Sequence, residues 1–140
     1  MTKRLLIFTI FFVLLSNFLL AKSKFFEEGL NLFKEKKYDE AKFKFEQDIV
    51  LNPKSEMSYL YLSRIFNNFK EKDLEEQNLY TVILLNPNNE DAIYYLAKLK
   101  LENSDYIKSK ELNEKLMNLC NKLCEKSKKL KIEIENLSKK

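Results

Sequence analysis

The sequence Leu-Asn-Pro occurs twice in this chain, at residues 51–53 and again 34 residues later at 85–87. The surrounding segments agree as well, because DIVLNPKSE at 48–56 matches VILLNPNNE at 82–90. A further match joins YLYLSRIF at 59–66 to IYYLAKLK at 93–100. A fixed period of about 20 to 50 residues is typical of stacked structural repeats. The period therefore predicts an array of similar units packed side by side.

The content of one period predicts two helices joined by a short turn. The first helix has an apolar face at helical spacing, formed by Phe25, Gly29, Leu32 and Phe33. After a polar turn at 36–37, the second helix begins at Tyr38 and has the inward residues Ala41, Phe45 and Ile49. Pro53 ends the pair, since proline cannot continue a helix interior. Ser55 and Asn89 are the predicted N-caps of the helices that follow.

Gly29 is the only glycine in the 140 residues, and it falls inside a predicted helix. Glycine in a helix interior costs roughly 1 kcal/mol relative to alanine. Its counterparts one and two periods later are Ser63 and Ala97, which are also small. This pattern predicts close packing of the second helix of the first unit against Gly29. We therefore expect Gly29→Leu to destabilise the chain and Gly29→Ala to be mild or stabilising.

These features together resemble the tetratricopeptide repeat (TPR) family, whose unit is a 34-residue helix–turn–helix with small residues at fixed points and a closing proline. The second unit, about 56–89, departs from the pattern where Glu75 replaces the small residue seen as Ala41, and the third, about 90–123, has no closing proline. The resemblance is carried by Gly29, Tyr38, Ala41, Phe45, Pro53, Ser63, Leu79, Pro87, Ala97 and Tyr106. It implies an all-α superhelical stack of about three repeats over residues 22–123, closed by a capping helix at 124–140.

In this family the first helices of successive repeats line a concave groove, which generally holds a peptide or helix of a partner protein. On the register above, the implied groove positions are Phe26, Leu30, Phe33, Leu60, Arg64, Asn67, Asn68, Tyr94, Lys98 and Leu101. Some members hold a C-terminal carboxylate with lysines and asparagines, but Phe26 and Leu30 occupy the corresponding positions of the first repeat, so that mode is not expected. The apolar residues of the first repeat are equally consistent with core packing.

Residues 1–21 have the order of a secretory signal peptide. Lys3 and Arg4 precede an apolar run from Leu5, and Ala21 is the expected last residue removed. The alternative is an uncleaved membrane anchor, since the 17 residues from Leu5 to Ala21 are near the lower limit for a spanning helix. Both interpretations place the remaining chain outside the cytoplasm. The lysine-rich, arginine-poor composition resembles AT-rich bacterial proteins, so the expected location is the periplasm or cell envelope, free or anchored to the inner membrane by residues 5–21.

The C-terminal third contains leucines at every seventh position, namely Leu116, Leu123, Leu130 and Leu137. A coiled-coil seam also needs an alternate apolar position, and Lys126 and Glu133 occupy it after Leu123. The pattern therefore favours a capping helix with a polar outer face. Self-association through this helix is the alternative, and a monomer is expected.

Cys120 and Cys124 are four residues apart and so share one helix face. They are consistent with buried thiols, with an intrahelical or intermolecular disulfide, or with two ligands of a metal site. The chain has no histidine and no third cysteine to complete such a site, so no metal is predicted.

Composition excludes several classes of function. With no histidine and one glycine, most catalytic constellations and any glycine-rich phosphate loop are missing, so neither an enzyme nor a cofactor is predicted. The balance of 25 basic and 21 acidic residues does not indicate a nucleic-acid surface. The sequence predicts an exported TPR-type interaction module, a scaffold or assembly factor of the cell envelope that binds other proteins. The alternative is a structural envelope protein that self-associates through its C-terminal helix, and membrane contact is expected only through an uncleaved leader.

Overall fold

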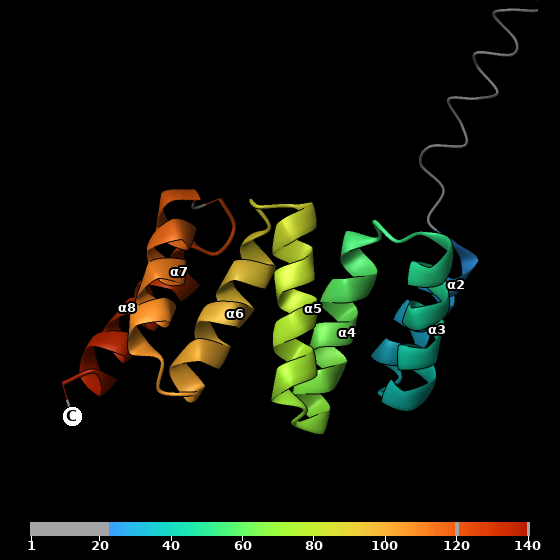
Figure 1. Ribbon diagram of the computed structural model, residues 1–140, viewed down its shortest axis with the longest axis horizontal. Coiled ribbons are helices and arrows are strands. Elements are labelled where there is room, and N and C mark those ends of the chain that lie inside the picture. The colour runs from blue at the N-terminus through green and yellow to red at the C-terminus, as the bar shows by residue number, and fades with distance from the viewer. Residues whose placement is uncertain (1–22, 120, 140) are drawn as a thin grey trace, which may run out of the picture.

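The computed structural model describes residues 23–119 and 121–139, and all regular secondary structure within them is α-helical. Figure 1 shows the helices side by side in a row. In chain order they are α2 (Lys24–Lys34), α3 (Tyr38–Leu51), α4 (Glu56–Phe69), α5 (Lys72–Leu85), α6 (Glu90–Glu102), α7 (Tyr106–Leu119) and α8 (Cys124–Leu137). The leader and Cys120 lie outside the described residues. None of the helices within the described ranges is long and apolar enough to cross a membrane.

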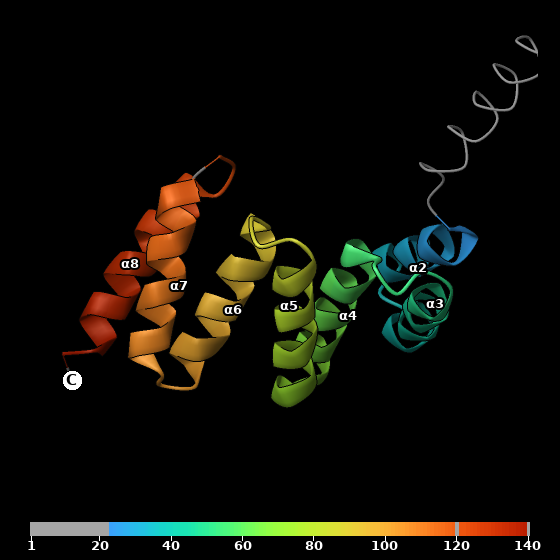
Figure 2. The ribbon, with the colours of Figure 1, turned by 45° about the horizontal axis from the view of Figure 1, so that its top comes forward.

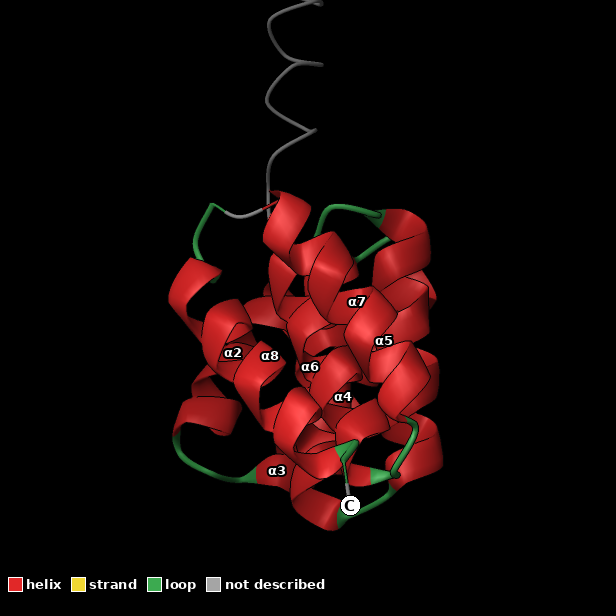
Figure 3. Ribbon diagram, turned by 90° about the vertical axis from the view of Figure 1, so that its left-hand side faces the viewer, coloured by secondary structure: helices red, strands yellow, loops and turns green. Residues whose placement is uncertain are grey.

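The helices pack as successive pairs. The closest neighbours are α2 with α3, α4 with α5, and α6 with α7, and α8 packs against α7 and reaches α6. Seen along the row in Figure 3, α5 and α7 lie on one side and α2 and α8 on the other. The predicted all-α stack of helix pairs followed by a final helix is confirmed. The third pair is complete, although its sequence lacks the closing proline.

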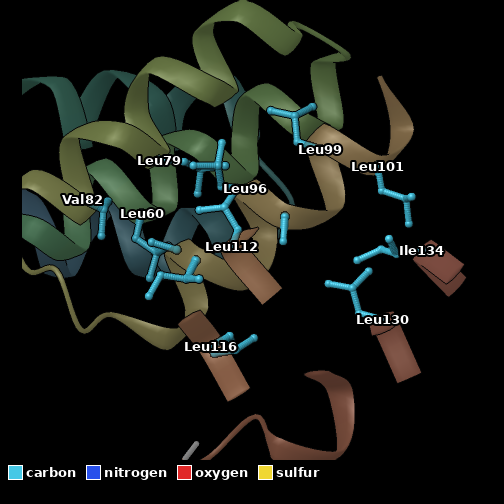
Figure 4. Packing of buried hydrophobic residues seen from close by; sticks show 13 residues of the cluster. Leu60, Leu79, Val82, Leu96, Leu99, Leu101, Leu112, Leu116, Leu130 and Ile134 are labelled. Carbon is cyan, nitrogen blue, oxygen red and sulfur yellow. The ribbon is translucent and has the colours of Figure 1, made fainter. Parts of the chain in front are cut away.

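Two apolar clusters hold the stack together. The first joins α2, α3 and α4 through Phe26, Ala41, Phe45, Leu62, Ile65 and Phe66. The second extends from α4 to α8, and Figure 4 shows leucines of α5, α6, α7 and α8 converging on it. Ala41, Phe45, Leu79 and Ala97, which carry the repeat pattern, are fully buried. The repeat residues are therefore the ones that supply the apolar contacts between helices, which is the dominant favourable term in folding.

Gly29 is buried against the second helix of its own repeat, as its sequence pattern predicts. A Cβ atom added at this position would lie 2.9 Å from Cε1 and 3.0 Å from Cδ1 of Phe45, and 3.2 Å from Cβ of Lys44. Ordinary carbon contacts are about 3.5–4.0 Å. The expectation that Gly29→Ala would be mild or stabilising is therefore corrected, because even a methyl group requires the buried ring of Phe45 to move.

The turn inside each repeat uses a left-handed residue that is not glycine. Lys36, Lys70 and Ser104 have φ values of 62°, 61° and 62°. They are spaced by the repeat period, and each follows the first helix of its pair. Side chains with a Cβ atom are strained in this region, which is why glycine is the usual residue after a helix end. The three repeats therefore share one turn geometry that no glycine marks in the sequence.

Two carboxylates at equivalent positions, Glu56 and Glu90, each connect the start of a repeat to the loop at its end. The Glu56 carboxylate accepts hydrogen bonds from the side-chain amides of Asn86, at 3.0 Å, and of Asn89. One period later, Glu90 accepts three backbone N–H bonds from residues 121–123 at 2.9–3.0 Å. We call these two groups the carboxylate links. Each holds the loop that ends one repeat against the first helix of that repeat.

One of the two predicted N-caps is confirmed. The side chain of Asn89 accepts from the backbone N–H of Ala92 at 2.8 Å at the start of α6. Ser55 makes no such bond at the start of α4, so its prediction is wrong. The Ser55 hydroxyl instead donates to the buried carboxylate of Asp48, which also accepts from Ser23 and Ser58. Donation alone does not prevent capping, because Ser23 donates to Asp48 and also accepts from the backbone N–H of Phe26 at the start of α2.

Candidate functional site

A cavity of about 270 Å³ opens between the repeats and is lined by side chains from α2 to α6. The first repeat contributes Phe33 and Tyr38, the third contributes Tyr95, and the second supplies the remainder. We call this cavity the central pocket, and its lining residues are Phe33, Tyr38, Ser63, Arg64, Asn67, Asn68, Glu75 and Tyr95. Concave sites with an apolar or aromatic wall and a few polar groups are typical of ligand binding.

Arg64 lies over the aromatic wall of the pocket. Its Cζ atom is 5.0 Å from the ring centroid of Phe33, 5.4 Å from that of Tyr61 and 6.0 Å from that of Tyr95. Within the described residues Arg64 forms no ion pair, so its guanidinium is held by rings rather than by a carboxylate. Cation–π contacts of this type hold the guanidinium against the rings without neutralising its charge.

Glu75 forms the acidic part of the pocket although it occupies a position for small residues. Glu75 is 4% exposed, so a carboxylate is buried here almost as completely as the small side chains of Ala41 and Ser109 at the equivalent positions of the other repeats. Both carboxylate oxygens accept from the side-chain amide of Asn67, at 3.1 and 3.0 Å. Burial raises the pKa of the Glu75 carboxyl above its ordinary value, and the hydrogen bond from Asn67 opposes that shift.

The structure divides the ten predicted groove residues into three groups. Four of them line the central pocket: Phe33, Arg64, Asn67 and Asn68. Three are half-buried outside it: Leu30 against the first cluster, Lys98 on α6, and Tyr94, whose ring lies 5.4 Å from the ammonium of Lys126 on α8. The other three are corrected: Phe26, Leu60 and Leu101 are only 4–5% exposed and belong to the apolar clusters, because they face the neighbouring helix of the stack.

Two pocket residues, Glu75 and Tyr95, were among neither the predicted groove positions nor the repeat-defining residues. Glu75 was visible in the sequence only as a departure from the repeat pattern, and that departure was the available signal. Tyr95 directly follows Tyr94 in the sequence, and the repeat register assigned Tyr94, not Tyr95, to the groove. Two repeat-defining residues, Tyr38 and the buried Ser63, also line the pocket. Tyr106 is half-buried against the second apolar cluster, and Pro53 and Pro87 are exposed in loops.

The cysteine and metal predictions concern the far end of the stack. Cys124 forms a disulfide. Cys120, the other cysteine in the sequence, lies outside the described residues, so its pairing stays a prediction. Across residues 23–119 and 121–139, no group of three or more histidine, cysteine, aspartate or glutamate side chains is placed to hold a metal ion.

Comparisons with known proteins place this architecture among solved structures. No protein-family model and no curated protein sequence matches the chain. Among solved structures, the first TPR domain of Spaghetti (RPAP3) bound to an HSP90 peptide, SRMEEVD, superposes with a TM-score of 0.75 at 18% identity, covering 83% of this chain and 91% of that one.

Two further structures agree with this match. The Yersinia enterocolitica type III secretion chaperone SycD, in complex with a peptide of the translocator YopD, has a TM-score of 0.74 at 17% identity, with 84% and 93% of the two chains covered. The TPR2B domain of yeast Sti1, in a complex with pHsp70, has a TM-score of 0.75 at 14% identity, with 82% and 99% covered. The helix pairs, their period and these superpositions together show that this chain has the fold of a tetratricopeptide-repeat domain.

Proposed function

We propose that this chain is a protein-interaction module that holds an extended segment of a partner protein across the central pocket. The observation that carries the proposal is the make-up of that pocket, which combines aromatic walls, the guanidinium of Arg64 and residues from three repeats. Similarly folded domains hold an HSP90 peptide in one case and a translocator peptide in another. We propose no catalytic or nucleic-acid-binding role.

The finer proposal is that this module is exported and works as a scaffold or assembly factor of a bacterial cell envelope. Its support is the leader, whose positive residues and apolar run are typical of export. Docking of a peptide in a preformed groove supplies specificity through a few side chains while the helices stay in place.

The test is site-specific photo-crosslinking of the full-length protein in its native cell. A crosslinking amino acid at Asn68, an exposed pocket residue, should capture a partner that the same probe at Ile107 does not, because Ile107 is exposed on α7 outside the pocket. Arg64→Gln should abolish the Asn68 crosslink and leave the melting temperature within about 2 °C, since it removes charge from a half-buried position. An unchanged crosslink in Arg64→Gln, or the same partner at both probe positions, would contradict the proposal.

Self-association through the C-terminal helix is the alternative function, and the structure disfavours it. Leu116 and Leu130 are buried within the chain, in the cluster that joins α8 to α6 and α7. The heptad leucines are therefore already used in capping the stack. Sedimentation of the full-length protein in detergent should give a monomer. A dimer that persists in the Cys120→Ser/Cys124→Ser variant would favour the alternative instead.

A further inference from the structure

Three aliphatic side chains with nothing packed over them lie at one end of the helices. Val50 and Leu51, in the last turn of α3, are 77% and 68% exposed, and Leu84, in the last turn of α5, is 82% exposed. Val50 and Leu84 are separated by the repeat period, so two successive repeats present an apolar side chain at the same place. Figure 1 shows the α3–α4 and α5–α6 loops, which follow these residues, at the same edge of the row. We call this edge the loop end.

The described chain also begins at the loop end. Ser23, the first described residue, donates a hydrogen bond to Asp48 near the end of α3, and Asp48 also accepts from Ser55 in the α3–α4 loop. Only residue 22 separates Ser23 from the apolar run that ends at Ala21. Because one extended residue spans at most about 3.6 Å, the apolar run ends within roughly 7 Å of Ser23.

We propose that the leader is retained as an anchor and that the loop end rests on the bilayer that residues 5–21 enter, with Val50, Leu51 and Leu84 in its interface. A tether this short keeps the start of α2, which lies at the loop end, next to the bilayer. The transfer of exposed aliphatic groups from water into the membrane interface has a favourable free energy, and it adds to the membrane affinity that the anchor provides. Charges at this end are mixed and mainly acidic, since Lys24, Lys54 and Lys122 lie with Asp48, Glu56, Glu90, Asp91 and Glu125, so the apolar side chains are what would favour the bilayer.

This orientation has a consequence for the central pocket. With the loop end on the membrane, the central pocket lies away from the bilayer, because Tyr38 begins α3 and Asn67 and Asn68 lie near the end of α4, at the opposite ends of these helices. The inference is independent of the proposed function, because it concerns a different face of the molecule.

The test uses the full-length protein, leader included, reconstituted in vesicles of phosphatidylethanolamine and phosphatidylglycerol. Single variants Val50→Cys, Leu84→Cys and Ile107→Cys are labelled with a polarity-sensitive fluorophore. Ile107 is the matched control, since it is as exposed as Val50, at 77%, but lies at the start of α7, at the opposite end of the helices. The unsubstituted protein, treated in parallel, measures background labelling of the native cysteines.

The expected result is a blue-shifted emission at positions 50 and 84, strongly quenched by lipid-attached quenchers, and neither effect at position 107. Mass spectrometry of the protein from its native membrane should show an intact leader. A mature chain that begins at residue 22 would overturn the inference, and so would labels at 50 and 84 that behave like the label at 107. Either failure leaves the crosslinking result at Asn68 unaffected, so the two proposals are tested separately.

Discussion

Replacing Gly29 with alanine tests the packing that explains why a glycine lies inside α2. Two effects of opposite sign meet at this position. Alanine is the better helix former by roughly 1 kcal/mol, which favours the variant. Against this, the new methyl group would lie 2.9 Å from Cε1 of Phe45, so the ring must be displaced by more than half an ångström to restore an ordinary contact.

The surroundings of Phe45 decide which effect is larger. Its ring is fully buried, stacks on Tyr61 with centroids 5.2 Å apart, and lies 5.8 Å from the ring of Phe26. Moving it therefore disturbs an aromatic cluster rather than a free side chain. Overpacking of this kind costs about 1–3 kcal/mol. Subtracting the gain in helix propensity leaves a net loss of about 1 kcal/mol, and a melting temperature lower by about 4 °C for a domain of this size.

The assay is thermal unfolding followed by circular dichroism, arranged as a double-mutant cycle with Phe45→Leu. In the Phe45→Leu background the ring is gone, so Gly29→Ala should become neutral or stabilising by up to ~1 kcal/mol. The control is Ala97→Gly at the equivalent position of the third repeat, where a Cβ atom already fits and its loss should cost about 1 kcal/mol. Gly29→Leu should be more damaging than Gly29→Ala.

The reasoning fails if Gly29→Ala alone raises the melting temperature by several degrees. That result would mean that helix propensity acts unopposed and that the close approach of Phe45 places no limit on the position. The reasoning would also be refuted if the changes in stability caused by Gly29→Ala and Phe45→Leu were additive in the double mutant, because additivity means that residues 29 and 45 are not coupled.

Three further predictions concern polar and strained positions. Glu75→Gln should have a higher melting temperature than the wild type at pH 8 and the same melting temperature near pH 4. The reason is that the pKa of the Glu75 carboxyl is raised in the folded state, so the wild type loses stability as the pH rises from about 4.5 through the folded pKa. A difference in melting temperature that is constant with pH would contradict this. Lys70→Gly should stabilise by about 0.5–1 kcal/mol in urea unfolding by relieving the left-handed strain, while Gln77→Gly within α5 should destabilise by about 1 kcal/mol. Backbone N–H bonds from residues 121–123 lower the pKa of Glu90, so Glu90→Gln should lower the protection factors of these amides in hydrogen exchange at neutral pH. Acidification of the wild type through that pKa should also lower the protection factors, measured relative to the intrinsic rate at each pH, whereas the exposed neighbour variant Asp91→Asn should leave them unchanged.

The fold could be predicted because its determinants repeat along the chain. Small or apolar residues recur at the positions where helices touch, as at Ala41, Phe45, Leu79 and Ala97. Their spacing in the sequence therefore indicates which residues pack between the helices. Pro53 and Pro87 mark the ends of helix pairs, because proline lacks a backbone N–H and cannot continue a helix whatever surrounds it. Period and residue type therefore suffice for the architecture.

The candidate site was predicted in part, for a different physical reason. Of the predicted groove positions, Phe33, Arg64, Asn67 and Asn68 line the central pocket, because helical periodicity fixes which face they occupy, and their role in binding a partner stays a prediction. Register cannot separate groove from core among apolar residues, since burial of Phe26, Leu60 and Leu101 depends on which neighbouring helix covers them.

Two other features depend on contacts between distant residues. Ser55 matches the sequence of an N-cap, but its side chain hydrogen-bonds to Asp48 on the preceding helix and makes no cap bond. The left-handed turns at Lys36, Lys70 and Ser104 carry no glycine at the left-handed position, so the coordinates are needed to reveal their shared geometry. Glu75 shows that a break in a repeat pattern is worth examining as a site in its own right.

The central pocket has a thermodynamic consequence, because its walls come from three different repeats. In a stack held by contacts between neighbours, a terminal helix pair can open while the others remain folded. Phe33, Arg64 and Tyr95 form one cavity only while all three repeats are docked, so a bound segment selects the fully assembled stack. Binding therefore stabilises every repeat together, by an amount set by ligand concentration and affinity. The partner would convert a chain that frays from its ends into one that unfolds as a single cooperative unit.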